Sequence, residues 1–160
     1  MALATLLVSC NKDNEKSMGL GFWNVESEDD SYVGYSNLYH AWYYFDEQKE
    51  GFDICFSDKG NFSNRSKSQW AYVDLAKSFC GVEHSLTENL DSDNWGFYGA
   101  TKTSEIFYDI SFSEGTVFLN VDMEANSIVF RLNGTTERGN KIKIDYVGSA
   151  KRMDDMVDPS

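Results

Sequence analysis

The chain has 160 residues, and its 26 acidic and 14 basic side chains give a formal net charge of −12 at pH 7. Nucleic acid is excluded as an expected partner, because phosphate backbones are bound by clustered Lys and Arg, and here the basic residues are scattered among the acidic ones. An anionic membrane surface would also repel this domain, so membrane attachment would have to come from a lipid. The length fits one domain with a sizeable core.

The first element is a short apolar run at residues 3–8, followed by a small residue, a cysteine and then a series of polar residues. An apolar segment that ends in a small residue is typical of a secretory signal, and this one is far shorter than the ~20 residues that span a bilayer. No basic residue precedes Lys12, so we expect Met1 to be an internal methionine with the natural start upstream.

Leu7-Val8-Ser9-Cys10 resembles the lipobox of bacterial lipoproteins. The resemblance implies that the preceding peptide is removed, that Cys10 carries the lipid, and that the protein is held in the cell envelope. The polar residues Lys12–Glu15 are similar to the acidic export tag of surface lipoproteins in Bacteroidota. The outer membrane is therefore the expected location, with the periplasmic and the surface-exposed sides both left open.

Composition and patterning divide the chain into four parts. We expect residues 1–10 to be a signal-peptide remnant with the lipobox, residues 11–20 a polar tether, residues 21–150 one all-β domain and residues 151–160 a frayed tail. Aromatic residues make up 15% of the chain and proline occurs once, which favours strands. No long segment keeps a helical period.

The first half of the domain is expected to contain four strands, at residues 21–25, 35–45, 52–56 and 70–74. The long second strand has two apolar faces: one carries Leu38, Trp42 and Tyr44, and the other carries Tyr35, Tyr39, Tyr43 and Phe45. In the third strand Phe52, Ile54 and Phe56 alternate inward. Residues 75–81 are predicted to form a short helical turn, capped by Asp74 and ended by Gly81.

The second half begins with a loop at residues 82–94 and short strands at residues 95–99 and 106–112. Three alternating strands follow, with inward residues Val117, Leu119, Val121 and Met123, then Ile128, Phe130 and Leu132, then Ile142, Ile144 and Tyr146. Hairpin connections are predicted at residues 124–126 and 133–140, the latter around Asn133-Gly134. These strands make a meander with one buried face.

About eight strands at regular spacing predict an antiparallel β-sandwich or a small β-barrel. Residues 70–78, 132–136 and 143–152 resemble a group of small uncharacterised lipoproteins of Bacteroidota, which implies shared architecture and no activity. Gly21-Phe22-Trp23 is similar to the start of lipocalin-like barrels. We leave sandwich and barrel open at this point.

Aromatic side chains are the candidate ligand-stacking residues, with core packing as the competing interpretation. They are Trp23, Tyr39, Trp42, Tyr43, Trp70, Trp95 and Tyr98. Cys55 and Cys80 could form one disulfide in an oxidising compartment or remain two buried thiols. Neither these cysteines nor His40 and His84 have metal-ligand spacing, so we expect no metal and no cofactor.

No nucleophile elbow, zinc-protease, nucleotide-binding or dinucleotide motif is present in the sequence. We therefore expect a non-enzymatic cell-envelope lipoprotein that binds a glycan or protein ligand. One alternative is an envelope-anchored hydrolase acting on glycans, which would need two carboxylates ~5–9 Å apart. Another is a structural adhesin or assembly component, which long unpaired edge strands would favour.

Overall fold

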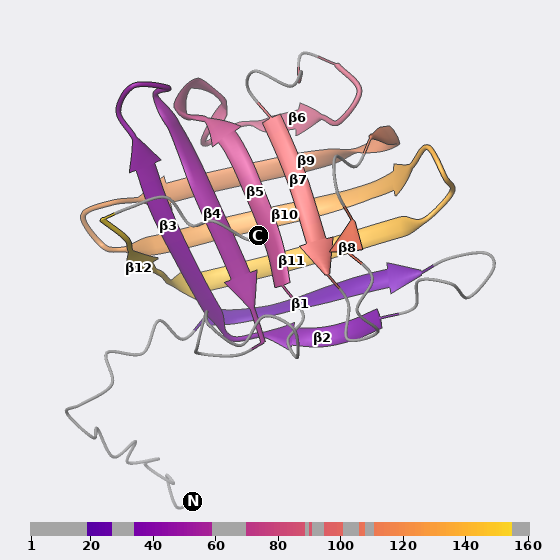
Figure 1. Cartoon of the computed structure of the whole chain (residues 1–160), viewed down its shortest axis with the longest axis horizontal. Coiled ribbons are helices and arrows are strands. Elements are labelled where there is room, and N and C mark those ends of the chain that lie inside the picture. The colour runs from indigo at the N-terminus through magenta and orange to yellow at the C-terminus, as the bar shows by residue number, and fades with distance from the viewer. Residues whose placement is uncertain are drawn as a thin grey trace, which may run out of the picture.

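The structure, a computed structural model, describes residues 19–26, 34–58, 70–88, 90, 95–100, 106–107 and 111–154. Twelve strands in this part of the chain form two six-stranded sheets (Figure 1). The first sheet has the order β2-β1-β11-β10-β9-β6 and the second has the order β12-β3-β4-β5-β7-β8. The predicted all-β class is confirmed, with twelve strands rather than about eight.

The strands of the first sheet are β2 (Gly34–Leu38), β1 (Gly19–Glu26), β11 (Lys141–Ser149), β10 (Ser127–Thr136), β9 (Phe112–Asp122) and β6 (Glu83–Ser85). Those of the second sheet are β12 (Lys151–Arg152), β3 (His40–Asp46), β4 (Gly51–Ser57), β5 (Trp70–Ala76), β7 (Trp95–Ala100) and β8 (Ile106–Phe107). Every described pairing is antiparallel except β12 with β3, which is parallel.

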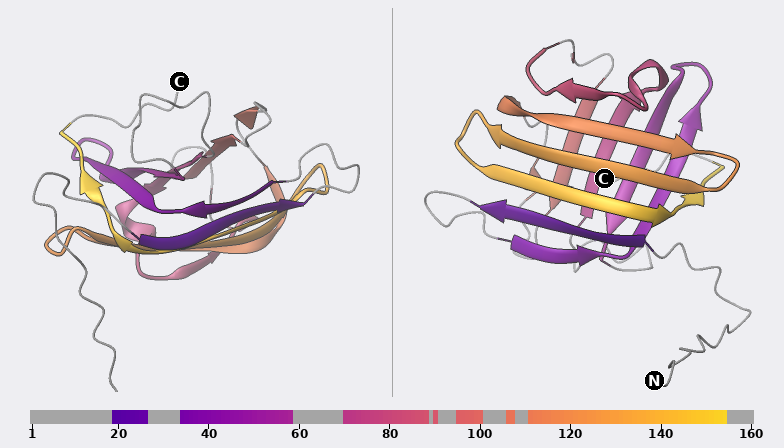
Figure 2. Two further views of the ribbon diagram at one scale, coloured as in Figure 1. Left: turned by 90° about the horizontal axis from the view of Figure 1, so that it is seen from below. Right: turned by 180° about the vertical axis from the view of Figure 1, so that it is seen from behind.

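The two sheets pack face to face as a sandwich, which resolves the choice between sandwich and barrel. Their strands cross steeply, as Figure 1 and the reverse view in Figure 2 show. In such packings the corners are made by strands that bend from one sheet into the other. The chain turns two corners of this kind, at Tyr39 between β2 and β3 and at Ala150 between β11 and β12.

The corner at Tyr39 corrects the prediction of one strand over residues 35–45. Leu38 ends β2 in the first sheet, and His40 begins β3 in the second. Because the chain changes sheets between them, Leu38 and Tyr43 both face the core, although one continuous strand would place them on opposite faces. Trp42, predicted to share a face with Leu38, belongs to a separate cluster of buried side chains.

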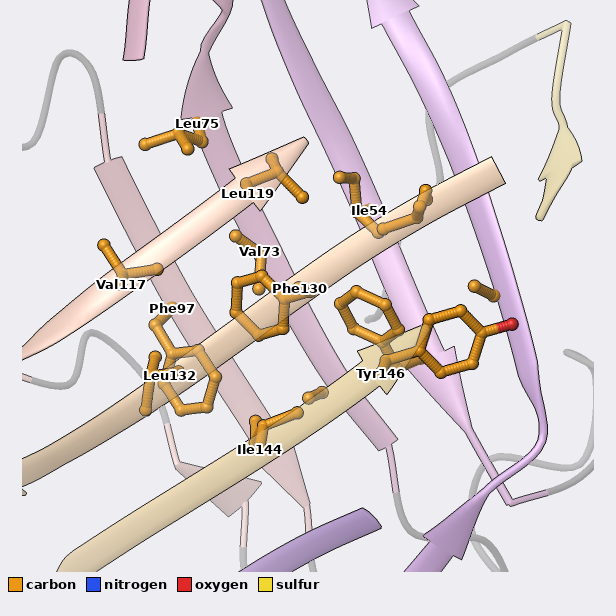
Figure 3. Close-up of a cluster of buried hydrophobic side chains, with 14 of the residues drawn as sticks. Ile54, Val73, Leu75, Phe97, Val117, Leu119, Phe130, Leu132, Ile144 and Tyr146 are labelled. Carbon is orange, nitrogen blue, oxygen red and sulfur yellow. The ribbon is translucent and has the colours of Figure 1, made fainter. Parts of the chain in front are cut away.

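The core lies between the sheets and follows the predicted alternation. Phe52, Ile54 and Phe56 of β4 face the inward residues of β9, β10 and β11, as predicted. Figure 3 shows this cluster, in which Phe130 and Tyr146 project from the first sheet between Ile54, Val73 and Phe97 of the second. Phe56 stacks on Phe130 with ring centroids 5.0 Å apart.

The C-terminal meander is confirmed, but its second hairpin differs from the prediction. β10 runs on to Thr136, so Asn133-Gly134 lies inside a strand and the turn follows it, with Gly139 at φ +83°. Gly134 pairs with Gly115, whose φ is +130°. A Cβ at Gly134 would lie 2.6 Å from Leu86 Cδ1 and 2.7 Å from Phe112 Cδ1, so glycine is needed here for close packing against these side chains.

Three further predictions are corrected. The helical turn is a single 3₁₀ turn, η2 (Lys77–Phe79), and Asp74 lies inside β5 rather than at a helix cap. The predicted loop after it contains β6, which pairs with β9. The predicted tether and tail also contain strand residues, because β1 begins at Gly19 and β12 pairs with β3. Both segments are ordered by backbone hydrogen bonds, from β1 to β11 and from β12 to β3.

Candidate functional site

The second sheet is buried on both of its faces at its centre, and this marks the candidate site. All seven residues of β4 are buried. Phe52, Ile54 and Phe56 face the core, so the alternate residues Asp53, Cys55 and Ser57 are buried on the outer face. A half-solvated antiparallel sheet would show polar, exposed residues at these positions. The outer face of β3, β4 and β5 therefore holds a second packed layer.

Strand register arranges this outer face in three rows. The first row contains Tyr44, Asp53 and Asp74, the second contains Trp42, Cys55 and Tyr72, and the third contains His40, Ser57 and Trp70. Trp42, Cys55, Trp70 and Tyr72 form one buried cluster, against which Tyr44 and Met153 pack. The face thus presents two carboxyl groups beside aromatic rings.

The two carboxyl groups lie directly opposite each other on adjacent strands. Asp53 pairs with Asp74 across β4 and β5, an arrangement that places Cβ atoms about 4.5–5.5 Å apart. Asp53 is only 3% exposed, and its Oδ1 accepts a hydrogen bond of 2.6 Å from the Tyr72 hydroxyl. Asp74 is half-buried in β5. Like charges at this spacing repel, so ionisation of one carboxyl group opposes ionisation of the other.

The pKa values of both carboxyl groups are shifted in the same direction. Burial raises the pKa of Asp53, while the hydrogen bond from Tyr72 and the charge of Lys49 oppose that rise. Burial also raises the pKa of Asp74, and the negative charge of Asp53 raises it further. An ionised carboxyl group accepts hydrogen bonds, and a protonated one also donates one, so each group can pair with polar atoms of a ligand.

Replacing Asp74 by asparagine is expected to stabilise the fold at neutral pH by about 0.2–1 kcal/mol, because it removes the like charge opposite Asp53. The raised pKa of Asp74 means that the wild-type protein loses stability as pH rises from the ordinary value of 3.8 through the folded-state pKa. The gain from Asp74→Asn should therefore be present at pH 7 and vanish in acid.

Urea unfolding of wild type and Asp74→Asn between pH 3 and pH 7 measures this difference. Glu124→Gln, an exposed substitution in the turn after β9, is the matched control and should show little change. A stability difference for Asp74→Asn that is the same at every pH would contradict the proposed repulsion.

A groove adjoins the carboxyl pair at the end of β3. It has a volume of about 520 Å³ and is lined by residues of the β3–β4 turn and of the segment after β11: Tyr44, Phe45, Asp46, Glu47, Gln48, Arg152, Met153 and Asp154. Asp46 Oδ1 accepts hydrogen bonds from the backbone N–H groups of Gln48 and Lys49, at 2.8 and 3.1 Å, and this orders the turn. Tyr44 lines the groove and pairs with Asp53, so it is the residue that the groove and the row of carboxyl groups share.

The structure separates the predicted ligand-stacking residues into different environments. Trp42 and Trp70, 6% and 5% exposed, lie in the outer-face cluster. Tyr43 is fully buried in the core and is not available for stacking, whereas Trp95 is half-buried and packs against the core. Tyr39 is exposed at the sheet corner. The side chains of Trp23 and Tyr98 lie outside the described part of the structure.

Cys55 and Cys80 are free thiols, so the predicted alternative of a disulfide is not supported. Cys55 lies on the outer face of β4, whereas Cys80 follows η2 and packs against the main core. Burial raises the pKa of the Cys80 thiol to about 11, which keeps it protonated and unreactive at neutral pH.

Sequence reasoning missed Asp53 and Asp74 as a pair. Asp53 was visible as the only charged residue in the alternating segment Phe52–Phe56, a position where a charge calls for an explanation. The sequence predicts that Asp74 caps a helical turn, and this interpretation does not place its side chain on the sheet next to Asp53. Cys10 and the rest of the predicted lipobox lie outside the described residues.

Within the described residues no three His, Cys, Asp or Glu side chains lie close enough to hold a metal ion. Nor does this part of the chain contain a helix with the length and apolar character needed to cross a bilayer. Comparison with protein-family models, with curated proteins and with solved structures found no match to this chain.

Proposed function

We propose that this chain is a lipid-anchored protein of the cell envelope and that its β-sandwich is a non-enzymatic binding module. Cys10 is the proposed attachment point, on the basis of the lipobox-like sequence Leu7–Cys10. The proposed binding surface is the groove at Tyr44 together with the half-buried Asp74, whose buried neighbour Asp53 raises its pKa. No cofactor takes part.

The observation that carries the binding proposal is that Tyr44 lines a groove and also lies in the row of the two carboxyl groups, beside a cluster of aromatic side chains. Ligand sites are typically lined by aromatic side chains with a few polar groups that fix orientation. Here Asp74 and Tyr44 are half-buried, and Trp42 and Tyr72 lie in the adjacent row of the same face. A neutral ligand rich in hydroxyl groups, such as a glycan, fits these acceptors better than an anion does.

The second candidate function, an envelope-anchored glycan hydrolase, is favoured by the same two carboxyl groups. Retaining glycosidases place their carboxyl groups about 5–5.5 Å apart, and one of them has a raised pKa. Asp53 and Asp74 stand on directly paired positions, and burial raises the pKa of each. The near-complete burial of Asp53 weighs against it, because a nucleophile has to reach the sugar.

The third alternative, an assembly component that adds strands to another chain, has less support. The outermost described strands are β2 and β6 in one sheet and β12 and β8 in the other. These have five, three, two and two residues. Short edge strands are a common protection against pairing between chains.

A test of the anchor uses protein purified from its native host. Intact-mass analysis should find a processed chain that begins with a lipidated Cys10, and Cys10→Ala should be released into the soluble fraction. Water-soluble wild-type protein with an unmodified Cys10 would overturn the anchor.

A test of the binding face uses an array of envelope oligosaccharides. Asp74→Asn and Tyr44→Ala should each lose most of the wild-type signal, while Asn133→Ala, an exposed change on the first sheet, should retain it. Release of reducing ends from a bound oligosaccharide would favour the hydrolase instead. Equal signals for all four proteins, or none for wild type, would overturn the proposal for this face.

A further inference from the structure

The outer face of the first sheet is a solvated surface along its middle rows. Arg131 pairs with Asp145 across β10 and β11. The Arg131 guanidinium lies over the Phe118 ring at 5.9 Å, and the Lys143 ammonium lies over the Phe22 ring at 5.6 Å. Each of these half-buried rings therefore has a cation beside it, which makes the middle of this face more polar.

One row of the same face differs, and it lies where β1 begins. Val147 pairs with Leu20 of β1 on one side and with Val129 of β10 on the other, and Val129 pairs with Asn120. None of these residues is charged, whereas the rows on either side contain Asp122 and Asp145. Val147 is 47% exposed and Val129 is half-buried.

Tyr39 extends this apolar surface across β1. It directly follows Leu38, whose partner in β1 is Gly21, and it is 38% exposed. Gly21 also pairs with Tyr146, so two strand spacings of about 4.8 Å separate the backbones of Leu38 and Tyr146, the residues that precede Tyr39 and Val147. Among the described residues the exposed large apolar side chains are Tyr39, Val147 and Val82, and Val82 precedes β6 at the opposite edge of the sheet.

We infer that the surface formed by Tyr39, Val147 and Val129 rests on the bilayer when the chain is anchored. This surface is called the corner below. The inference rests on the proposed lipid at Cys10. Gly19, the first residue of β1, follows Cys10 by nine residues. A fully extended chain covers at most about 3.3–3.6 Å per residue, so the start of β1 stays within about 30 Å of the membrane.

The chemistry of the corner fits uncharged lipid. Tyrosine is enriched at the boundary between headgroups and acyl chains, and an uncharged valine row carries no charge that contact with lipid would desolvate. The net charge of −12 disfavours an anionic surface, so the partner is a bilayer of zwitterionic phospholipid. The contact would fix which end of the sandwich faces the membrane.

The test uses the full lipidated chain on phosphatidylcholine vesicles, with flotation to follow the anchor and hydroxyl-radical footprinting to follow the contact. Cys10→Ala protein mixed with the same vesicles is the reference. In the lipidated protein Tyr39 should lose most of its oxidation. His84 of β6, at the opposite sheet edge, should be oxidised equally in both.

Two matched variants separate contact from attachment. Val147→Asp places a charge in the corner, so it should restore oxidation of Tyr39 while the protein still floats with vesicles. Val82→Asp makes the same change at the opposite edge and should leave Tyr39 protected. Tryptophan fluorescence reports whether each variant is folded.

The outcomes distinguish this inference from the anchor on which it rests. Lipidated protein that floats while Tyr39 is oxidised as in the reference would overturn the membrane contact and leave the anchor standing. If the wild-type protein from the native host carries no lipid and does not float with the vesicles, both the anchor and the membrane contact are overturned.

Discussion

Truncation of Phe130 to alanine is expected to lower the free energy of unfolding by about 3–5 kcal/mol, the usual cost of deleting a buried phenyl ring. Phe130 is fully buried in the central strand of the meander, and its ring stacks on Phe56 of the opposite sheet (Figure 3). The substitution therefore removes contacts across the interface of the two sheets and leaves a cavity between them. Domains of this size are stable by only about 5–15 kcal/mol, so much of the total would be lost.

Chemical denaturation of wild type and Phe130→Ala at pH 7 gives the difference in unfolding free energy. Asn133→Ala lies in the same strand with an exposed, outward side chain, so it should change stability by no more than about 0.5 kcal/mol. A loss below about 1 kcal/mol for Phe130→Ala would mean that the sheets do not pack through this ring.

Replacing Tyr72 by phenylalanine is expected to cost about 1.5–3 kcal/mol at neutral pH, the range for a hydrogen bond to a charged group. Tyr72 donates a 2.6 Å hydrogen bond to Asp53, which is buried. That bond lowers the pKa of Asp53 against the larger raising effect of burial, so it stabilises the ionised carboxyl. Without it, the pKa of Asp53 rises further.

The cost of Tyr72→Phe should depend on pH with a defined sign. A carboxyl whose folded-state pKa lies further above its unfolded value loses more stability as pH rises through that interval. The variant should therefore be closest to wild type near pH 4 and furthest from it near pH 7, as measured by urea unfolding. In an Asp53→Asn background, the cost should fall to the about 0.5–1.5 kcal/mol of a neutral hydrogen bond. A loss that is independent of pH would contradict an ionised Asp53.

The sequence predicts the meander because the pattern of each strand can be recognised from neighbouring residues alone. In β9, β10 and β11 the inward apolar residues recur at every second position, and this period of two assigns them to one face without knowledge of the partner strand. The same reasoning placed Phe52, Ile54 and Phe56 in the core. It placed the second hairpin too early, because Asn133-Gly134 is a turn sequence in isolation and here packs beneath Leu86 and Phe112.

The candidate site depends on information that is not local. Asp53 and Asp74 meet because β4 and β5 pair in one register, and a shift by one residue would turn the side chains of one strand to the other face. Residues 35–45 were equally ambiguous, since apolar side chains on both faces fit a continuous strand as well as a corner. Only the positions of the two sheets decide that the chain bends at Tyr39.

The partners of β1 have a consequence for the order in which the protein folds. Glu26 pairs with Lys141, far along the sequence, so β1 gains this partner only after β11 has left the ribosome. The hairpins β3–β4 and β4–β5 emerge earlier, and their core-facing side chains have no cover until the meander arrives. Such distant pairing predicts folding on the order of milliseconds to seconds, with an aggregation-prone interval during synthesis.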